Sequence, residues 1–135
     1  MIIDATNLKL GRIATIVAKH ALLGETVSVI NIEKAVITGT KKNILAKYQR
    51  QYNRGGPHWG PFQPRMPDRF ARKVIRNMLP FKTPRGREAL KRISCFIGNP
   101  HSVQAQSIPD AHISNSLTMK YISLQELCSL LGGNV

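Results

Sequence analysis

Residues 1–31 read MIIDATNLKLGRIATIVAKHALLGETVSVIN, and this stretch predicts the fold class. Residues 1–5 predict a short strand, and residues 11–23 predict a helix, because their apolar side chains recur at helical spacing. Residues 26–31 are rich in β-branched side chains, which favours a second strand. A strand, a helix and a strand in this order are typical of an α/β fold with a parallel sheet and a right-handed crossover.

The remaining elements follow from the same kinds of pattern. Helices are predicted over residues 40–54, 67–79, 83–92 and 123–131, and extended segments over residues 35–38, 93–97 and 121–122. The first of these helices has Thr40 as its possible N-cap, and the last begins with Ser123 and Glu126 at the spacing of a capping box. Residues 54–66 predict a loop, because three glycines and three prolines fall within thirteen residues.

The positive charge of the chain lies in one segment. The formal net charge is +13, and the fifteen lysines and arginines from Lys41 to Arg92 face only two acids, Asp68 and Glu88. This stretch, which we call the basic segment, therefore holds the whole net charge, since the charges of the two flanks cancel. Self-repulsion on this scale destabilises a folded chain unless a polyanion is bound, and nucleic acid is the commonest polyanion.

A solvated surface or a membrane would account for the charge less well than nucleic acid does. A short charge run is usually a solvated face, but two acids cannot neutralise fifteen bases. An acidic membrane surface calls for a basic amphipathic helix at a terminus or a lipid anchor, and neither terminus has such a feature. No apolar run approaches the length of a membrane span, and residues 1–4 lack the start of a signal peptide, so an intracellular protein is expected.

Catalytic, metal and cofactor sites have little support in the sequence. Gly11 is the one glycine after the first strand, where the dinucleotide fingerprint has three, and no GxxxxGK[ST] loop or GxSxG elbow occurs. Cys95 and Cys128 stand among apolar residues and are expected to be buried free thiols, and the four histidines are isolated from one another. We therefore expect no enzyme activity, no cofactor, no metal and no small-molecule substrate.

The helix predicted over residues 67–79 has two distinct faces. Its apolar face consists of Phe70, Val74, Ile75 and Met78. Its basic face consists of Arg69, Arg72, Lys73 and Arg76, which follow one another at helical spacing. Arginine predominates there, and its planar guanidinium suits phosphate binding and stacking on bases.

Residues 38–42, at the start of the basic segment, and two aromatic residues within it are further candidate RNA contacts. Residues 38–42 place backbone amides beside two lysines at a predicted helix start, which suits a phosphate site, an ordinary N-cap, or both. Trp59 and Phe62 stand on the predicted loop, where they can stack on unpaired bases or anchor the loop to the domain. The single RGG at residues 54–56 is more typical of a turn than of an RNA-binding repeat.

Residues 76–93, RNMLPFKTPRGREALKRI, resemble the signature of a known family, the thirteenth protein of the large ribosomal subunit in its archaeal and eukaryotic form. Shorter matches follow the same order at residues 10–14, 29–34, 37–39, 56–58 and 98–100. The resemblance covers roughly residues 1–100, and the last third matches mostly by its final helix. Asn77 replaces the usual glycine of the family, and the absence of a long basic C-terminal extension favours the archaeal type.

The resemblance implies a single domain over residues 1–135, with a three-layer α/β/α core, a mainly parallel sheet of about four strands, and the basic segment, 41–92, as an insertion. It implies a non-catalytic structural role in the large ribosomal subunit in the cytoplasm. There the chain would bind rRNA beside other ribosomal proteins and support subunit assembly. The alternatives are a free-standing RNA- or DNA-binding or chaperone module and, third, a nucleotide-using enzyme. The predicted RNA-binding residues are Thr38, Lys41, Lys42, Lys47, Arg50, Arg54, His58, Trp59, Arg65, Arg69, Arg72, Lys73, Arg76, Lys82, Arg85, Arg87, Lys91 and Arg92.

Overall fold

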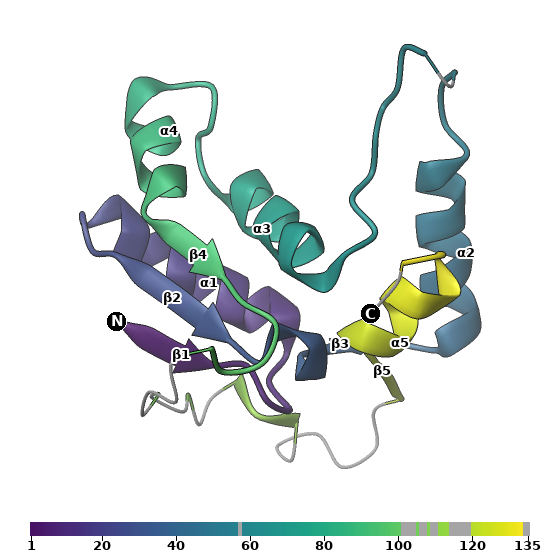
Figure 1. Ribbon diagram of the computed structural model, residues 1–135, viewed down its shortest axis with the longest axis horizontal. Coiled ribbons are helices and arrows are strands. Elements are labelled where there is room, and N and C mark those ends of the chain that lie inside the picture. Colours follow the sequence, from purple (N-terminus) through teal and green to yellow (C-terminus); the bar gives the residue numbers. More distant parts are fainter. Residues whose placement is uncertain (57, 101–104, 106–107, 109–110, 114–119, 134–135) are drawn as a thin grey trace.

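The computed structural model describes residues 1–56, 58–100, 105, 108, 111–113 and 120–133 (Figure 1). Its elements in chain order are β1 (Ile2–Asp4), α1 (Leu10–Leu22), β2 (Val27–Ile30), the 3₁₀ turn η1 (Ile32–Lys34), β3 (Val36–Thr38), α2 (Lys41–Tyr52), α3 (Pro67–Met78), α4 (Pro84–Lys91), β4 (Ile93–Cys95), β5 (Tyr121–Ser123) and α5 (Leu124–Leu130). Every helix and strand expected from the sequence is confirmed, with ends that differ by no more than two residues.

The strands form two sheets. In the first, β1, β2 and β4 are parallel in the order β1-β2-β4, with Ile3 opposite Val29 and Val29 opposite Cys95. In the second, β3 pairs with β5 in antiparallel orientation. The α/β class with a mainly parallel sheet is therefore confirmed, although the parallel sheet has three strands rather than about four.

A turn after β2 explains why β3 leaves the parallel sheet. Asn31 has a left-handed backbone with φ +52°, and η1 follows it directly. An amide side chain tolerates this conformation better than most others do. The Asn31 side chain also donates a hydrogen bond of 3.1 Å to Asp4 Oδ1, which ties the turn to the end of β1.

The pKa of Asp4 reflects this corner of the sheet. Partial burial by itself raises the pKa, but hydrogen bonds from Thr6 and Asn31, together with the charge of Lys34, outweigh that effect. The pKa of Asp4 therefore lies below its usual value of 3.8. The charged carboxylate thus stabilises the junction between β1 and the turn.

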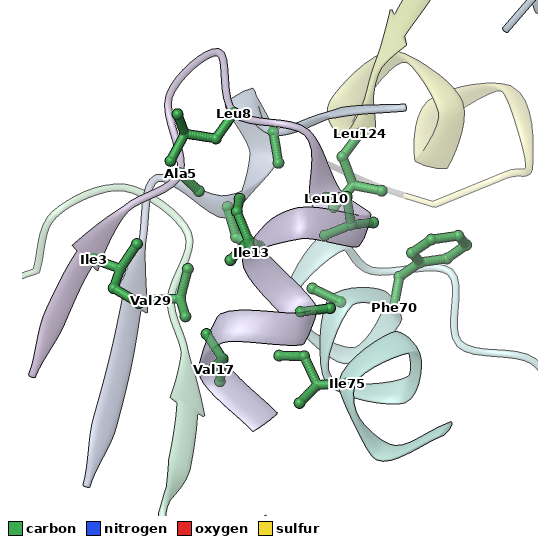
Figure 2. Close-up of a cluster of buried hydrophobic side chains, with 14 of the residues drawn as sticks. Ile3, Ala5, Leu8, Leu10, Ile13, Val17, Val29, Phe70, Ile75 and Leu124 are labelled. Atoms are coloured by element: carbon green, nitrogen blue, oxygen red, sulfur yellow. The ribbon is translucent and has the colours of Figure 1, made fainter. Parts of the chain in front are cut away.

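Helices pack against one face of the parallel sheet. Side chains alternate along each strand, so Ile3, Val29 and Ile93 are fully buried on this face, whereas Ser28 and Ser94 lie half-buried on the other. Figure 2 shows α1 and α3 on the same side of the strands. In the residues that the structure describes, the second helical layer expected for an α/β/α sandwich is not seen.

The hydrophobic core lies between the sheet, α1 and α3. In Figure 2, Ile3 and Val29 point from the strands toward Ile13 and Val17 of α1, and α3 closes the cluster from the opposite side of α1. Burying a side chain of this size contributes about 1.5–3 kcal/mol. The core therefore holds α3 firmly, and α3 carries the predicted basic face.

Candidate nucleic-acid interface

The basic segment runs through α2, the connection from α2 to α3, α3 itself and α4. Residues 53–66, which we call the arm, rise away from the core between α2 and α3 (Figure 1). The turn at residues 79–83 then leads from α3 to α4, which returns the chain to β4. The segment is thus fixed to the core at α3 and β4, and the arm projects from it.

Helix α3 presents its basic face outward because its apolar face is packed in the core. Phe70, Ala71 and Ile75 are buried, and the ring of Phe70 meets Tyr48 of α2 edge to face, with 5.1 Å between ring centroids. The predicted apolar stripe needs one correction, because Met78 at the end of the helix is 43% exposed. Ala71, which was not among the predicted apolar residues, occupies the buried stripe instead.

The basic face of α3 is held in position by contacts with its surroundings. The Arg72 guanidinium donates a hydrogen bond of 3.2 Å to the Leu90 carbonyl oxygen of α4. The Arg76 guanidinium lies 4.4 Å from the centroid of the Phe81 ring, a cation–π contact. These contacts restrict the side chains and leave charged N–H groups free for an anion.

Lys73 is the half-buried member of this face. Its ammonium donates a hydrogen bond to Gln63 Oε1 of the arm. Burial first, and the nearby positive charge of Arg76 second, lower the pKa of Lys73. A phosphate bound nearby would favour the charged form and so counteract both effects.

The arm is anchored at its base. The Tyr52 hydroxyl donates a hydrogen bond to the Pro64 carbonyl oxygen, and the Arg65 guanidinium lies 5.6 Å from the centroid of the Tyr52 ring. Gly133, just after α5, approaches the same point so closely that a Cβ there would lie 2.5 Å from the Arg65 carbonyl oxygen. Contacts from α2, α3 and the end of α5 therefore set the direction in which the arm leaves the core.

The tip of the arm is a tight glycine turn. The Gly60 amide donates a hydrogen bond of 3.0 Å to the Gly56 carbonyl oxygen. Gly55 and Gly60 both have positive φ, and a Cβ on Gly55 would lie 1.8 Å from the Gly60 carbonyl oxygen. The interpretation of the RGG stretch as a turn is thus confirmed. Pro57, within the resemblance at residues 56–58, lies outside the described residues.

The two aromatic residues of the arm are largely exposed. Trp59 is 93% exposed and Phe62 is 75% exposed. Neither anchors the arm, because the anchoring contacts come from Tyr52, Gln63 and Arg65 at its base. The sequence allowed these rings either to stack on bases or to anchor the loop, and the structure excludes the anchoring role.

A hollow of about 300 Å³ lies between the arm, α3 and α4. It is lined by Phe62, Pro64, Arg69, Arg72, Lys73, Arg76 and Leu90. Four cations and one exposed aromatic ring thus surround the hollow, which concentrates positive charge at one point of the surface. Guanidinium groups of this kind bind phosphate oxygens through paired N–H donors.

The turn after α3 is built by close packing. Thr83 caps α4, since its side-chain oxygen accepts a hydrogen bond of 3.3 Å from the Gly86 amide. A Cβ on Gly86 would lie 2.1 Å from the Pro80 carbonyl oxygen, so only glycine fits there. The Arg87 guanidinium donates a hydrogen bond of 3.1 Å to the Lys82 carbonyl oxygen. This turn therefore holds the cations of α4 beside those of α3.

Few of the fifteen cations have acidic partners. In the described part of the chain, Lys41 pairs with Glu126 of α5 at 2.5 Å, and Arg92 pairs with Glu88 at 3.9 Å. No ion pair is found for the other thirteen among the described residues, which agrees with the excess of bases over acids in the sequence. A surface with this excess of positive charge is suited to contact with a polyanion.

The start of α2 differs from the sequence expectation. Thr40 occupies the N-cap position, but its side chain makes no capping hydrogen bond. The ion pair with Glu126 engages Lys41, although both groups are about half exposed and such pairs are weak. Lys42 is exposed and has no such partner in the described residues, which leaves it as the more available of the two lysines for a phosphate.

Sixteen of the eighteen predicted RNA-binding residues are exposed, and the other two, Lys73 and Arg92, are half-buried. The structure also brings Lys9 and Arg12 next to Thr38, around a hollow of about 410 Å³ at the start of α1. Sequence reasoning missed these two cations because they lie far from the basic segment in the chain. Only the tertiary structure places Lys9 and Arg12 at the edge of the basic segment.

The described residues also bear on metal ligands, membrane spans and reactive thiols. No group of three histidine, cysteine or acidic side chains there is arranged to hold a metal ion, and no described helix is long and apolar enough to cross a membrane. Both cysteines are free; Cys128 is buried, as expected, but Cys95 is only partly buried. Burial raises the pKa of each thiol to about 11, which favours the neutral thiol over a reactive thiolate.

Comparison with known proteins gives consistent matches. The family model described as ribosomal protein L13 matches residues 1–102. The protein named large ribosomal subunit protein uL13 from Methanopyrus kandleri is 45% identical over 136 residues, covering 97% of this chain and 86% of its own. Its namesake from Archaeoglobus fulgidus is 42% identical, with the same coverage of both chains. That from Methanocaldococcus jannaschii is 45% identical and covers 97% of this chain and 96% of its own. Similarity to these relatives thus extends into the last third, which resembled the family only loosely.

Proposed function

The chain belongs to the ribosomal protein L13 family, and from this we propose that it is a structural constituent of the large ribosomal subunit. In this role it works in the cytoplasm without catalysis, binds rRNA through the basic segment, and supports assembly of the subunit. The observation that carries the proposal is the set of thirteen cations of the basic segment with no acidic partner in the described residues.

The geometry supports a scaffold role for the core and an RNA-binding role for the basic segment. The sheet, α1 and the apolar face of α3 form a packed core of buried hydrophobic side chains. The arm, the basic face of α3, and α4 present cations along one connected stretch of surface. Neutralising phosphates with these cations releases counterions, and RNA recognition then depends mainly on backbone and shape.

Sedimentation of ribosomal subunits tests the structural role. In cells that express the chain, we expect it to sediment with the large subunit through a sucrose gradient at moderate salt. Recovery only in the free-protein fractions would contradict the proposal and favour a free-standing nucleic-acid-binding module.

A triple variant tests the part played by the basic segment. We expect Arg69→Gln, Arg72→Gln and Arg76→Gln together to release the chain from the subunit at lower salt than the unaltered protein. The matched control replaces Lys19, Lys34 and Lys120, three exposed lysines outside the basic segment, with glutamine. If both triple variants dissociate at the same salt concentration, net charge rather than the basic segment governs binding.

Depletion tests the assembly role. When synthesis of the chain is stopped, we expect incomplete large-subunit particles to accumulate, and expression of the unaltered chain to restore complete subunits. Normal subunit profiles after depletion would contradict a role in assembly.

A further inference from the structure

Trp59 at the tip of the arm has no structural role within the described protein. Its side chain is 93% exposed and makes no hydrogen bond, ion pair or ring contact with any described residue. Tryptophan is the largest apolar side chain and usually contributes to stability by being buried. Its backbone belongs to a turn that is closed by the hydrogen bond from the Gly60 amide to the Gly56 carbonyl oxygen, so the side chain is presented at the tip of the arm.

The charge around the arm identifies the chemistry of a partner. Residues 53–66 contain no acid, and they carry Arg54, His58 and Arg65. The basic face of α3 borders the same arm through the hollow that Phe62 lines. The cations of the arm and of α3 attract a polyanion such as RNA. A protein partner would need a strongly acidic surface to complement the same charge.

The exposed ring of Trp59 favours RNA with unpaired bases over an RNA duplex. Bases inside an A-form duplex are stacked and offer no free ring face to a protruding side chain. Bases in loops, bulges and single strands do offer their faces, and aromatic side chains stack on them with little dependence on base identity. The arm tip therefore suits unpaired nucleotides next to a phosphate backbone held by the arginines.

We propose that Trp59 stacks on an unpaired base of the bound RNA, while the basic face of α3 holds the phosphates of the same RNA. This inference rests on the proposed function and specifies the RNA that the surface binds: a strand with unpaired nucleotides. Phe62 provides a second exposed ring at the border of the basic hollow, closer to the phosphate-binding cations.

The chain offers a direct readout, because Trp59 is its only tryptophan. We would titrate the full chain with a single-stranded oligoadenylate and with a fully paired RNA duplex of equal phosphate number, and record tryptophan emission. Stacking predicts strong quenching by the oligoadenylate and little change with the duplex. Equal quenching by both RNAs, or none by either despite measurable binding, would overturn the stacking proposal.

Substitutions give the second readout. We expect Trp59→Ala to weaken oligoadenylate binding roughly 5- to 150-fold, the range for losing one stacked base. Duplex binding should fall by less than about twofold, because the phosphate contacts and the salt dependence are unchanged. Trp59→Phe should restore most of the affinity. The control is Tyr121→Ala, which removes an exposed aromatic ring, 55% accessible, from outside the basic segment and should leave binding unchanged.

The outcomes separate this inference from the function on which it rests. If the unaltered chain binds neither RNA even at low salt, the proposed RNA-binding function itself fails. If it binds both with steep salt dependence, but Trp59→Ala has no effect or weakens both equally, only the stacking proposal is overturned. Unaltered RNA binding by Trp59→Ala would then direct the search to a protein partner for the arm tip.

Discussion

The basic face of α3 makes a quantitative prediction about the salt dependence of RNA binding. Replacing Arg69, Arg72 and Arg76 with glutamine removes three charges but keeps polar side chains of similar reach. The helix should persist, because its opposite face is buried through Phe70 and Ile75. The perturbation thus acts on the phosphate contacts and leaves the scaffold in place.

The expected magnitude follows from counterion release. The first and last of the three arginines are seven residues apart in α3, or about 10 Å along the helix axis, so each can contact its own phosphate. Each phosphate contact steepens the dependence of log K on log salt by about 0.7–0.9. If the chain makes about six such contacts, the slope is roughly −4 to −5, and losing three should make it less steep by about 2–3.

Equilibrium binding of an RNA duplex at a series of KCl concentrations measures this slope. The lysine triple variant, with Lys19, Lys34 and Lys120 replaced by glutamine, has the same net charge as the arginine variant but keeps the basic face of α3. Its slope should match that of the unaltered chain. An unchanged slope in the arginine variant, or an equal change in the lysine variant, would refute the assignment of phosphate contacts to α3.

Three further predictions concern the scaffold. Gly86→Ala should destabilise the fold by about 1–3 kcal/mol in urea unfolding, because its Cβ would meet a backbone carbonyl at 2.1 Å. Gly11→Ala, whose Cβ meets nothing within 4 Å, should instead stabilise α1 by about 0.5–1 kcal/mol. If Gly86→Ala and Gly11→Ala changed the free energy of unfolding equally, the close packing around Gly86 would be contradicted. Because folding lowers the pKa of Asp4, its contribution to stability is complete above 3.8 and is lost as the pH falls toward the folded value. Asp4→Asn should therefore flatten the dependence of unfolding free energy on pH below about 4, and an unchanged acid limb would contradict this. Finally, Cys95 and Cys128 should alkylate far more slowly in the folded protein than in urea at mildly alkaline pH, and equal rates by mass spectrometry would contradict their raised pKa.

Local features of the sequence predicted the elements well. The bounds of α3 followed from Pro67 at its start and the spacing of its two faces. The cap predicted at Ser123 forms, whereas the one predicted at Thr40 makes no side-chain hydrogen bond. Such signals succeed because they depend on interactions between residues three or four positions apart. The error at Met78 arose because spacing alone does not tell which end of an apolar stripe the core covers.

The sequence by itself determined where the charge lies, which elements form, and that a parallel βαβ unit starts the chain, because these depend on composition and short-range geometry. Only the tertiary structure decided the partner of β3, which pairs with β5 more than eighty residues later, and the engagement of Lys41 by Glu126. It also decided the direction of the arm and the exposure of Trp59, through contacts at Pro64 and Arg65 from α2 and the end of α5. Contacts of that kind join segments with no pattern in common, and they form only when the whole core has brought those segments together.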